Sequence, residues 1–340
     1  MAIRVLQVGL GPIGVAVARQ LATRPGFLLV GGVDVDPALA GRDLAQVCGL
    51  PSALEAVVHR ELEPALAALR PDAAVVCTSS ALERVAPTLQ TCLAGGAAVV
   101  STTEELAYPW RERPELARRL DQAARRAGRA LLGTGVNPGF AMDALPLIFT
   151  AVCERVDSIT VRRVQDASRR RLPFQKKIGA GLSVAAFRDK VAAGEVRHVG
   201  LAESVSMIAD AMGWQLDSIT DEIAAVIALH DVASEHLAVA QGQVCGLEQI
   251  GVGRQGERVR VRLELRAALG APESYDEVAI EGSPSLVSRV VGGIPGDVAT
   301  ASVAVNAIPR VLAAPPGLVT MKDLPPVYCW PGDPRAPEPE

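Results

Sequence analysis

Short apolar segments alternate with helical segments along the first 135 residues of the chain. The apolar segments lie at residues 3–9, 27–36, 73–79, 97–102 and 129–135. Runs of this length, apolar throughout, are typical of strands that helices cover on both faces of a parallel sheet. The segments 82–94 and 114–128 have helical spacing. The pattern therefore predicts an α/β Rossmann dinucleotide-binding domain.

The pattern changes after residue 140. Residues 158–168, SITVRRVQDAS, alternate as a half-exposed strand does, and 249–269 reads as two strands joined by a tight turn. Residues 276–291 add another strand with its continuation, and 201–212 has the spacing of a helix. Strand pairs mixed with helices predict an α+β domain with an open, mostly antiparallel sheet.

A chain of 340 residues is too long for one ordinary core. We expect a Rossmann NAD(P)-binding domain over residues 1–140 and an α+β substrate and dimerisation domain over 141–294. Residues 295–340 begin with a helical pattern at 296–314 and end in the Pro-rich stretch PGDPRAPEPE. We expect this segment to return to the Rossmann domain and to finish in a flexible tail.

Composition narrows the class of protein. The net charge of −4 provides no basic footprint for nucleic acid, and no apolar run approaches the roughly 18 residues of a membrane span. The N-terminus lacks the features of a signal peptide, and the six cysteines form no CxxC pair. We therefore expect a cytoplasmic protein with no nucleic-acid or membrane partner.

The turn after the first strand reads Gly9-Leu-Gly11-Pro12-Ile13-Gly14, a GxGxxG between a strand and a helix. In such a turn the first glycine permits the tight bend, the second lets a pyrophosphate approach the backbone, and the third allows close helix–strand packing. A proline suits the helix start because its missing donor is not needed there. We expect NAD or NADP at this turn; a tight turn without a ligand is the alternative.

The second apolar segment ends in VDVD. Asp34 lies 20 residues after Gly14, near the spacing of the acid that binds the adenosine ribose. Asp36 is the alternative, because strict alternation along a strand would point the Asp34 and Asp36 side chains the same way. Asp36 could instead be a turn residue before Pro37. An acid here favours NAD, and Arg42 is close enough in sequence to leave NADP open.

Polar residues follow the later strands, where ligands of a doubly wound sheet bind. We expect these side chains to line the cofactor's path, although Ser79 and Ser80 could instead cap a helix. The turn 133–139, GTGVNPG, would pass the nicotinamide and could equally be a linker between domains. The predicted contacts are Thr78, Ser79, Ser80, Thr102, Thr103 and Asn137.

Glu104 and Glu105 stand at the end of the strand within VVSTTEELAYPW. Adjacent loop residues point in different directions, so one carboxylate should face the pocket while the other caps a helix or meets solvent. A carboxylate beside a nicotinamide could take a proton from a substrate ammonium. We expect Glu104 to have this role; a glutamate at a surface helix start is the alternative.

No Cys–His pair, GxSxG motif or metal-ligand histidine spacing occurs in the sequence, so we expect no metal. His198 precedes a helix and could line a substrate pocket or be a core histidine. The basic residues at 169–171 and 176–177 could bind an anion or form a solvated loop. Phe174 lies in the same loop, which could act as a lid over the site.

Several motifs in order resemble one family. They are GLGPIG, VDVDPALAGRDL, VSTTEELAYPW, TGVNPGF, HVGLAES, GDVAT and APPGLVTMKDLP. Over residues 3 to 328 the chain resembles the 2,4-diaminopentanoate dehydrogenase family, which includes NAD(P)-dependent amine dehydrogenases. Its N-terminal half is more distantly similar to dihydrodipicolinate reductase, whose catalytic His/Lys segment has no counterpart here.

The resemblance implies reversible oxidative deamination of a small-molecule amine to a ketone or aldehyde and ammonia. It carries the family's catalytic glutamate onto TTEEL, at Glu104, and implies a homodimer with an apolar cavity between the two domains. By motif position the cavity wall would include Phe140, Ala141 and Met142, with Phe174 and His198 as further members. The alternatives are an imine or enamine reductase and a non-catalytic NAD(P)-binding redox sensor.

Overall fold

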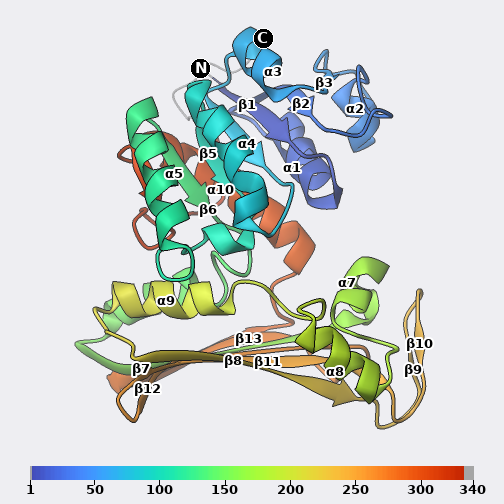
Figure 1. The fold of residues 1–340 in the computed structure, drawn as a ribbon, viewed down its shortest axis with the longest axis vertical. Coiled ribbons are helices and arrows are strands. Elements are labelled where there is room, and N and C mark those ends of the chain that lie inside the picture. The colour runs from blue at the N-terminus through green and yellow to red at the C-terminus, as the bar shows by residue number, and fades with distance from the viewer. Residues whose placement is uncertain (1, 333–340) are drawn as a thin grey trace. The chain divides into compact units, whose positions relative to one another are not determined.

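A computed structural model describes residues 2–332, which form two compact units (Figure 1). The first unit comprises residues 1–140 and 295–340, and the second comprises 141–294. The second unit is therefore an insertion into the first. The predicted flexible tail falls largely at 333–340, outside the described residues.

The first unit contains a seven-stranded parallel sheet in the order β15-β6-β5-β4-β1-β2-β3. The chain reverses its direction of travel across the sheet between β1 and β4, which is the topological switch point where such sheets bind ligands. The strands are β1 Ile3–Val8, β2 Phe27–Val33, β3 Val58–His59, β4 Ala73–Val76, β5 Ala98–Ser101, β6 Ala130–Gly133 and β15 Gly317–Val319.

Helices cover both faces of this sheet, which explains why its strands are apolar throughout. On one face α3, α4 and α5 bury side chains in a common core with β1, β4, β5 and β6, while α1 and α10 pack together and α10 contacts β5. The helices are α1 Pro12–Thr23, α2 Leu44–Cys48, α3 Leu62–Leu69, α4 Leu82–Ala94, the 3-10 helix η1 Glu104–Leu106, α5 Pro114–Ala127 and α10 Gly296–Ala313.

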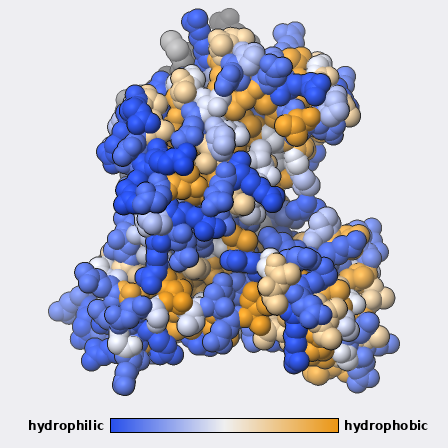
Figure 2. Space-filling view, in the orientation of Figure 1, coloured by the Kyte–Doolittle hydropathy of each residue, from blue (hydrophilic) through white to orange (hydrophobic). Residues whose placement is uncertain are grey.

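Helix α5 shows how the sequence pattern sets this packing. Ala117, Leu120 and Ala124 recur at helical spacing and are fully buried. Arginines occupy the other side of the helix, and hydrophilic residues cover this region of the surface in Figure 2.

The second unit contains a six-stranded sheet in the order β14-β13-β7-β12-β11-β8, with β7 and β12 parallel and the other pairs antiparallel. Helix α9 packs on β8, β11 and β12. The elements are α6 Ala144–Phe149, η2 Thr150–Val152, β7 Arg155–Asp166, η3 Ala167–Arg169, α7 Leu172–Lys177, α8 Val184–Ala192, α9 Leu201–Ala211, β8 Ser218–Ile227, β9 Val232–Ala233, β10 Ala238–Val239, β11 Val244–Gln255, β12 Arg258–Ala268, β13 Tyr275–Ser283 and β14 Leu286–Val291.

These elements confirm the predicted fold class. The expected helices over 82–94 and 201–212 are α4 and α9, and the alternating segment 158–168 lies mostly within β7. The helix expected at 296–314 is α10, which packs within the first unit. Among residues 2–332, no helix has the length and apolar character needed to cross a membrane.

A buried ion pair fixes the point where the chain leaves the second unit. Arg163 on β7 donates to Asp276 on β13 over 2.5 Å, and both side chains are at most 4% exposed. The same two side chains bind the main chain of Ile294. Arg163 donates to the Ile294 carbonyl oxygen, and the Ile294 N–H donates to the Asp276 carboxylate. The pair thereby holds the last residue of the unit against the sheet.

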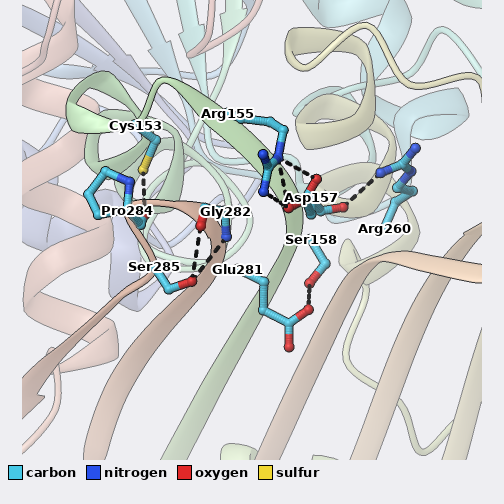
Figure 3. Close-up of polar contacts among 9 residues, drawn as sticks. All are labelled: Cys153, Arg155, Asp157, Ser158, Arg260, Glu281, Gly282, Pro284 and Ser285. Carbon is cyan, nitrogen blue, oxygen red and sulfur yellow. Dashed lines mark hydrogen bonds and ion pairs between the residues drawn. The ribbon is translucent and has the colours of Figure 1, made fainter.

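An exposed set of contacts lies at one end of the same sheet (Figure 3). Arg155 pairs with Asp157 at 3.0 Å, and Arg260 donates to the Asp157 carbonyl oxygen. The hydroxyl of Ser158 donates to Glu281. Solvent screens charges at this end, so these contacts contribute much less to stability than the buried pair.

Replacing Asp276 with alanine should lower the free energy of unfolding by about 3–5 kcal/mol, because Arg163 would remain buried without its counter-charge. Denaturant unfolding followed by circular dichroism would measure the change. Arg155→Met, at the exposed pair, should leave the midpoint almost unchanged.

The double variant Arg163→Met/Asp276→Leu tests the cause. Removing both charges should recover much of the lost stability. If the double variant were no more stable than Asp276→Ala, charge burial would not be the reason.

Candidate active site

The glycine-rich turn has the geometry expected from its sequence. Gly9 has a φ of +86°, and a Cβ there would lie 2.5 Å from the carbonyl oxygen of Cys77. A Cβ on Gly14 would lie 1.9 Å from the carbonyl oxygen of Gly9, so only glycine fits at both positions. At Gly11 a Cβ would meet no atom within 4 Å. The space above Gly11 is therefore open to a ligand.

Helix α1 begins at Pro12, and no side chain caps its N-terminus at Gly11. The first N–H groups of a helix lack partners within the helix and carry its positive dipole end. An uncapped N-terminus beside an open glycine fits the pyrophosphate of a dinucleotide. The residues of this turn thus fit the cofactor that the motif predicts.

Asp34 connects the end of β2 to the glycine-rich turn. Its two carboxylate oxygens accept hydrogen bonds from the N–H of Leu10 at 2.6 Å and from the N–H of Asp36 at 2.9 Å. The side chain is partly exposed, so it can also reach a ribose hydroxyl. This position supports Asp34 as the predicted ribose acid.

The alternation argument for Asp36 is wrong. Strand β2 ends at Val33, three residues earlier, so Asp36 no longer follows the two-residue period of a strand. Its carboxylate accepts from the N–H of Ala38, which is the turn role that Pro37 suggested. Arg42 lies on the exposed loop that follows.

Gln7 was missed by the sequence reasoning. It is fully buried in β1, and its amide nitrogen donates to the carbonyl oxygen of Gly9 over 2.8 Å. The available signal was a lone polar residue inside an apolar strand. Burial also raises the pKa of the neighbouring Cys77 thiol, which keeps the region under the turn neutral.

Buried hydroxyls join the ends of β4 and β5. Thr103 is 1% exposed, and its hydroxyl donates to the Ser79 carbonyl oxygen over 2.8 Å. The Thr103 N–H donates to the hydroxyl oxygen of Ser101. Thr103 therefore positions the loops, with its hydroxyl already engaged, whereas Thr78 is exposed and Ser80 and Thr102 are partly exposed at the same edge.

The two adjacent glutamates have different surroundings. The Glu105 carboxylate accepts from the N–H of Leu82, the first residue of α4, over 2.8 Å, and lies 3.7 Å from Arg113. It therefore caps α4, which is one of the two roles expected for the glutamate outside the pocket and the alternative role expected for Ser79 and Ser80. Glu104 begins η1 and is partly exposed.

The end of β6 lies against η1. A Cβ on Gly133 would be 2.5 Å from the carbonyl carbon and oxygen of Leu106, so glycine permits this close approach. The N–H of Thr134 donates to the Ser101 carbonyl oxygen over 2.8 Å. The structure thus brings Glu104 and the loop that carries Asn137 to the same edge of the sheet as the glycine-rich turn.

The predicted pocket residues differ in how deeply they are buried. Phe140 is partly buried in the first unit. Ala141 and Met142, in the second unit, are 0% exposed. Phe174 is partly buried beneath Arg170, whose guanidinium carbon lies 4.1 Å from the ring centroid. Lining roles for these residues stay predictions.

His198 is held by its backbone. Its N–H donates to the side-chain oxygen of Gln249 over 2.7 Å, and its carbonyl oxygen accepts from the same amide over 2.9 Å. Burial first, and then the positive charges of Lys177, Arg163 and Arg197, lower the pKa of His198 to about 3. The imidazole is therefore neutral at physiological pH. Among residues 2–332, no group of three or more His, Cys, Asp or Glu side chains could hold a metal ion.

Comparison with known proteins agrees with this fold. The fold and the glycine-rich turn define the class: a two-domain protein of the Rossmann dehydrogenase type. Residues 140–337 match the 2,4-diaminopentanoate dehydrogenase C-terminal domain. The chain is also 31% identical to 2,4-diaminopentanoate dehydrogenase of Acetoanaerobium sticklandii over 329 residues, covering 95% of this chain and 93% of that protein. The chain belongs to the 2,4-diaminopentanoate dehydrogenase family.

Solved structures extend the comparison. An amine dehydrogenase from Mycobacterium smegmatis superposes with a TM-score of 0.86 at 27% identity, covering 98% of this chain and 99% of that one. A dihydrodipicolinate reductase from Paenisporosarcina sp. TG-14 gives a TM-score of 0.52 at 15% identity, covering 95% of this chain and 99% of that one. The second likeness concerns the fold alone.

Glu105→Ala should lower the free energy of unfolding by about 1 kcal/mol, because α4 would lose the acceptor at its first N–H. Thermal or urea unfolding would detect the change. Glu115→Ala, on the exposed surface of α5, is the matched control. An equal effect of the two substitutions would show that the cap is not the cause.

His198 should make the protein less stable in acid. The unfolded histidine binds a proton near its ordinary pKa of 6.5, whereas the folded one does so only near about 3. Acidification through this window therefore favours the unfolded state, and between pH 6.5 and 5 this group should remove about 2 kcal/mol. Urea titrations at the two pH values should show a smaller loss for His198→Gln than for His236→Gln, an exposed control. Identical losses would contradict the neutral, buried imidazole.

Proposed function

We propose that this protein is an NAD(P)-dependent amine dehydrogenase that catalyses reversible oxidative deamination. A primary amine, the oxidised cofactor and water would give a ketone or aldehyde, ammonia and the reduced cofactor. Family membership supports an NAD(P)-dependent oxidoreductase acting on amines. The finer assignment, to particular residues, rests on the geometry of the first unit.

The cofactor would lie along the carboxyl edge of the parallel sheet. The main chain at Gly11 and the N-terminus of α1 would hold the pyrophosphate, and Asp34 would bind the adenosine ribose. When bound, the nicotinamide supplies the acceptor for the electrons of the C–H bond. The carboxylate of Asp34 favours NAD, since it would repel a 2′-phosphate.

The observation that carries the catalytic assignment is the use of Glu105 as the cap of α4. This contact commits Glu105 to α4, whereas Glu104, the first residue of η1, is partly exposed at the same strand end. Glu104 would accept a proton from the substrate ammonium, giving the neutral amine from which oxidation can proceed. In the reverse direction it would hold the ammonium or iminium charge.

Glu104→Gln should lower kcat by about 100- to 10,000-fold, because the amide cannot accept the proton. The unfolding midpoint and the Kd for NADH should stay near the wild-type values. Amine-dependent reduction of NAD+ and NADP+, measured by absorbance, would test this. Full activity of a folded Glu104→Gln variant would overturn the assignment.

Ammonia dependence separates the alternatives. An amine dehydrogenase should reduce a ketone only when ammonium is present, whereas an imine reductase would turn over a preformed imine without it. A redox sensor would bind cofactor without turnover across a panel of amines.

The homodimer stays a prediction, and gel filtration of the protein would test it.

A further inference from the structure

Two polar atoms in the loop after β6 have no hydrogen-bond partner among the described residues. They are Thr134 Oγ1 and Asn137 Oδ1, and both atoms are buried from solvent. Thr134 is 3% exposed as a whole. A buried polar atom without a partner lowers stability, so such atoms are rare in folded proteins and call for an explanation.

The loop is held in place by its main chain. The N–H of Thr134 donates to Ser101 on β5, and the N–H of Val136 lies 3.4 Å from the hydroxyl oxygen of Thr300 on α10. Gly139 has a φ of +120°, and a Cβ there would lie 2.7 Å from Thr134 Oγ1. The side chains of Thr134 and Asn137 therefore belong to a tightly folded loop.

The location connects this pair to the proposed chemistry. Gly133, the residue before Thr134, abuts Leu106 at the end of η1, the helix that begins with Glu104. The loop also lies at the carboxyl ends of the strands, where ligands of a doubly wound sheet bind. The two atoms thus belong to a loop that begins where β6 meets the 3-10 helix of the proposed catalytic carboxylate.

We propose that Thr134 and Asn137 form a binding point for an N–H2 group of the bound ligands. This inference rests on the proposed function. An amide oxygen can only accept hydrogen bonds, while a hydroxyl can accept or donate. Asn137 Oδ1 therefore accepts an N–H, and Thr134 Oγ1 either accepts a second N–H or donates to an adjacent carbonyl.

Two ligands of the reaction carry such a group. One is the primary carboxamide of the nicotinamide, whose N–H2 and carbonyl oxygen both match the pair. The other is ammonia, or the amine that is formed from it. In either case binding supplies the hydrogen bonds that the free protein lacks.

The first test compares Thr134→Val with Thr134→Ser in the ligand-free protein. If the hydroxyl is unpaired, valine removes an unsatisfied polar atom, and the thermal midpoint should rise by about 2–4 °C. Serine keeps the hydroxyl and serves as the control. A midpoint for Thr134→Val below that of Thr134→Ser would show that the hydroxyl is already bonded, and would overturn the proposal.

The second test measures binding of NADH by fluorescence. Thr134→Val and Asn137→Ala should each weaken binding by about 3- to 10-fold if the carboxamide is the ligand. The reduced 3-acetylpyridine analogue replaces the carboxamide N–H2 with a methyl group. Asn137→Ala should bind this analogue as tightly as the wild type does.

The third test covers ammonia. If ammonia or the amine is the ligand, the Kd for NADH should stay unchanged while the apparent KM for ammonium rises by a similar factor. Unchanged values of both constants in both variants would overturn the proposal. The fluorescence measurement needs no turnover, so it can be read even if the proposed amine activity fails.

Discussion

The residue before Glu104 is held by a hydrogen bond between two loops, from the hydroxyl of Thr103 to the carbonyl oxygen of Ser79. This bond joins the chain leaving β5 to the chain leaving β4, where the ladder of the sheet has ended. Its donor, Thr103, is 1% exposed, and a hydrogen bond in a less polar environment is stronger than one in open solvent. Together with the bond from the Glu105 N–H to the Ser80 carbonyl oxygen, the Thr103 bond holds the start of η1 beside the loop that leads into α4.

The same geometry gives two chemically identical neighbours different tasks. Glu105 meets the positive end of a helix and a main-chain N–H, which together stabilise its negative charge. The Glu105 carboxylate therefore stabilises the start of α4. Glu104 is the first residue of the single turn of 3-10 helix and is partly exposed. A one-residue change in the register of this turn would exchange the two roles.

Much of the first unit could be predicted because its signals are local. The apolar strands, the GxGxxG turn and the helix at 82–94 are each contained within a short segment. The extent of β2 was overestimated because the Asp34 carboxylate turns toward Leu10, 24 residues away in sequence. The Glu105 cap joins residues 23 positions apart, and the buried pair Arg163–Asp276 joins residues 113 apart. Such contacts leave no periodic trace, so sequence reasoning could not find them. Short elements such as α3 were missed for a different reason, because eight residues give only a weak helical period.

The inserted second unit affects the order in which the protein can be completed during synthesis. The seven-stranded sheet ends with β15, which pairs with β6 across more than 180 residues of intervening chain. Helix α10, which packs against α1, is also made after the insertion. The ribosome must therefore release the whole second unit before the nucleotide-binding unit can close. The usual order, in which the N-terminal domain folds first, is reversed for the final step. A chain stalled before residue 296 would carry the glycine-rich turn but lack part of the scaffold that supports it.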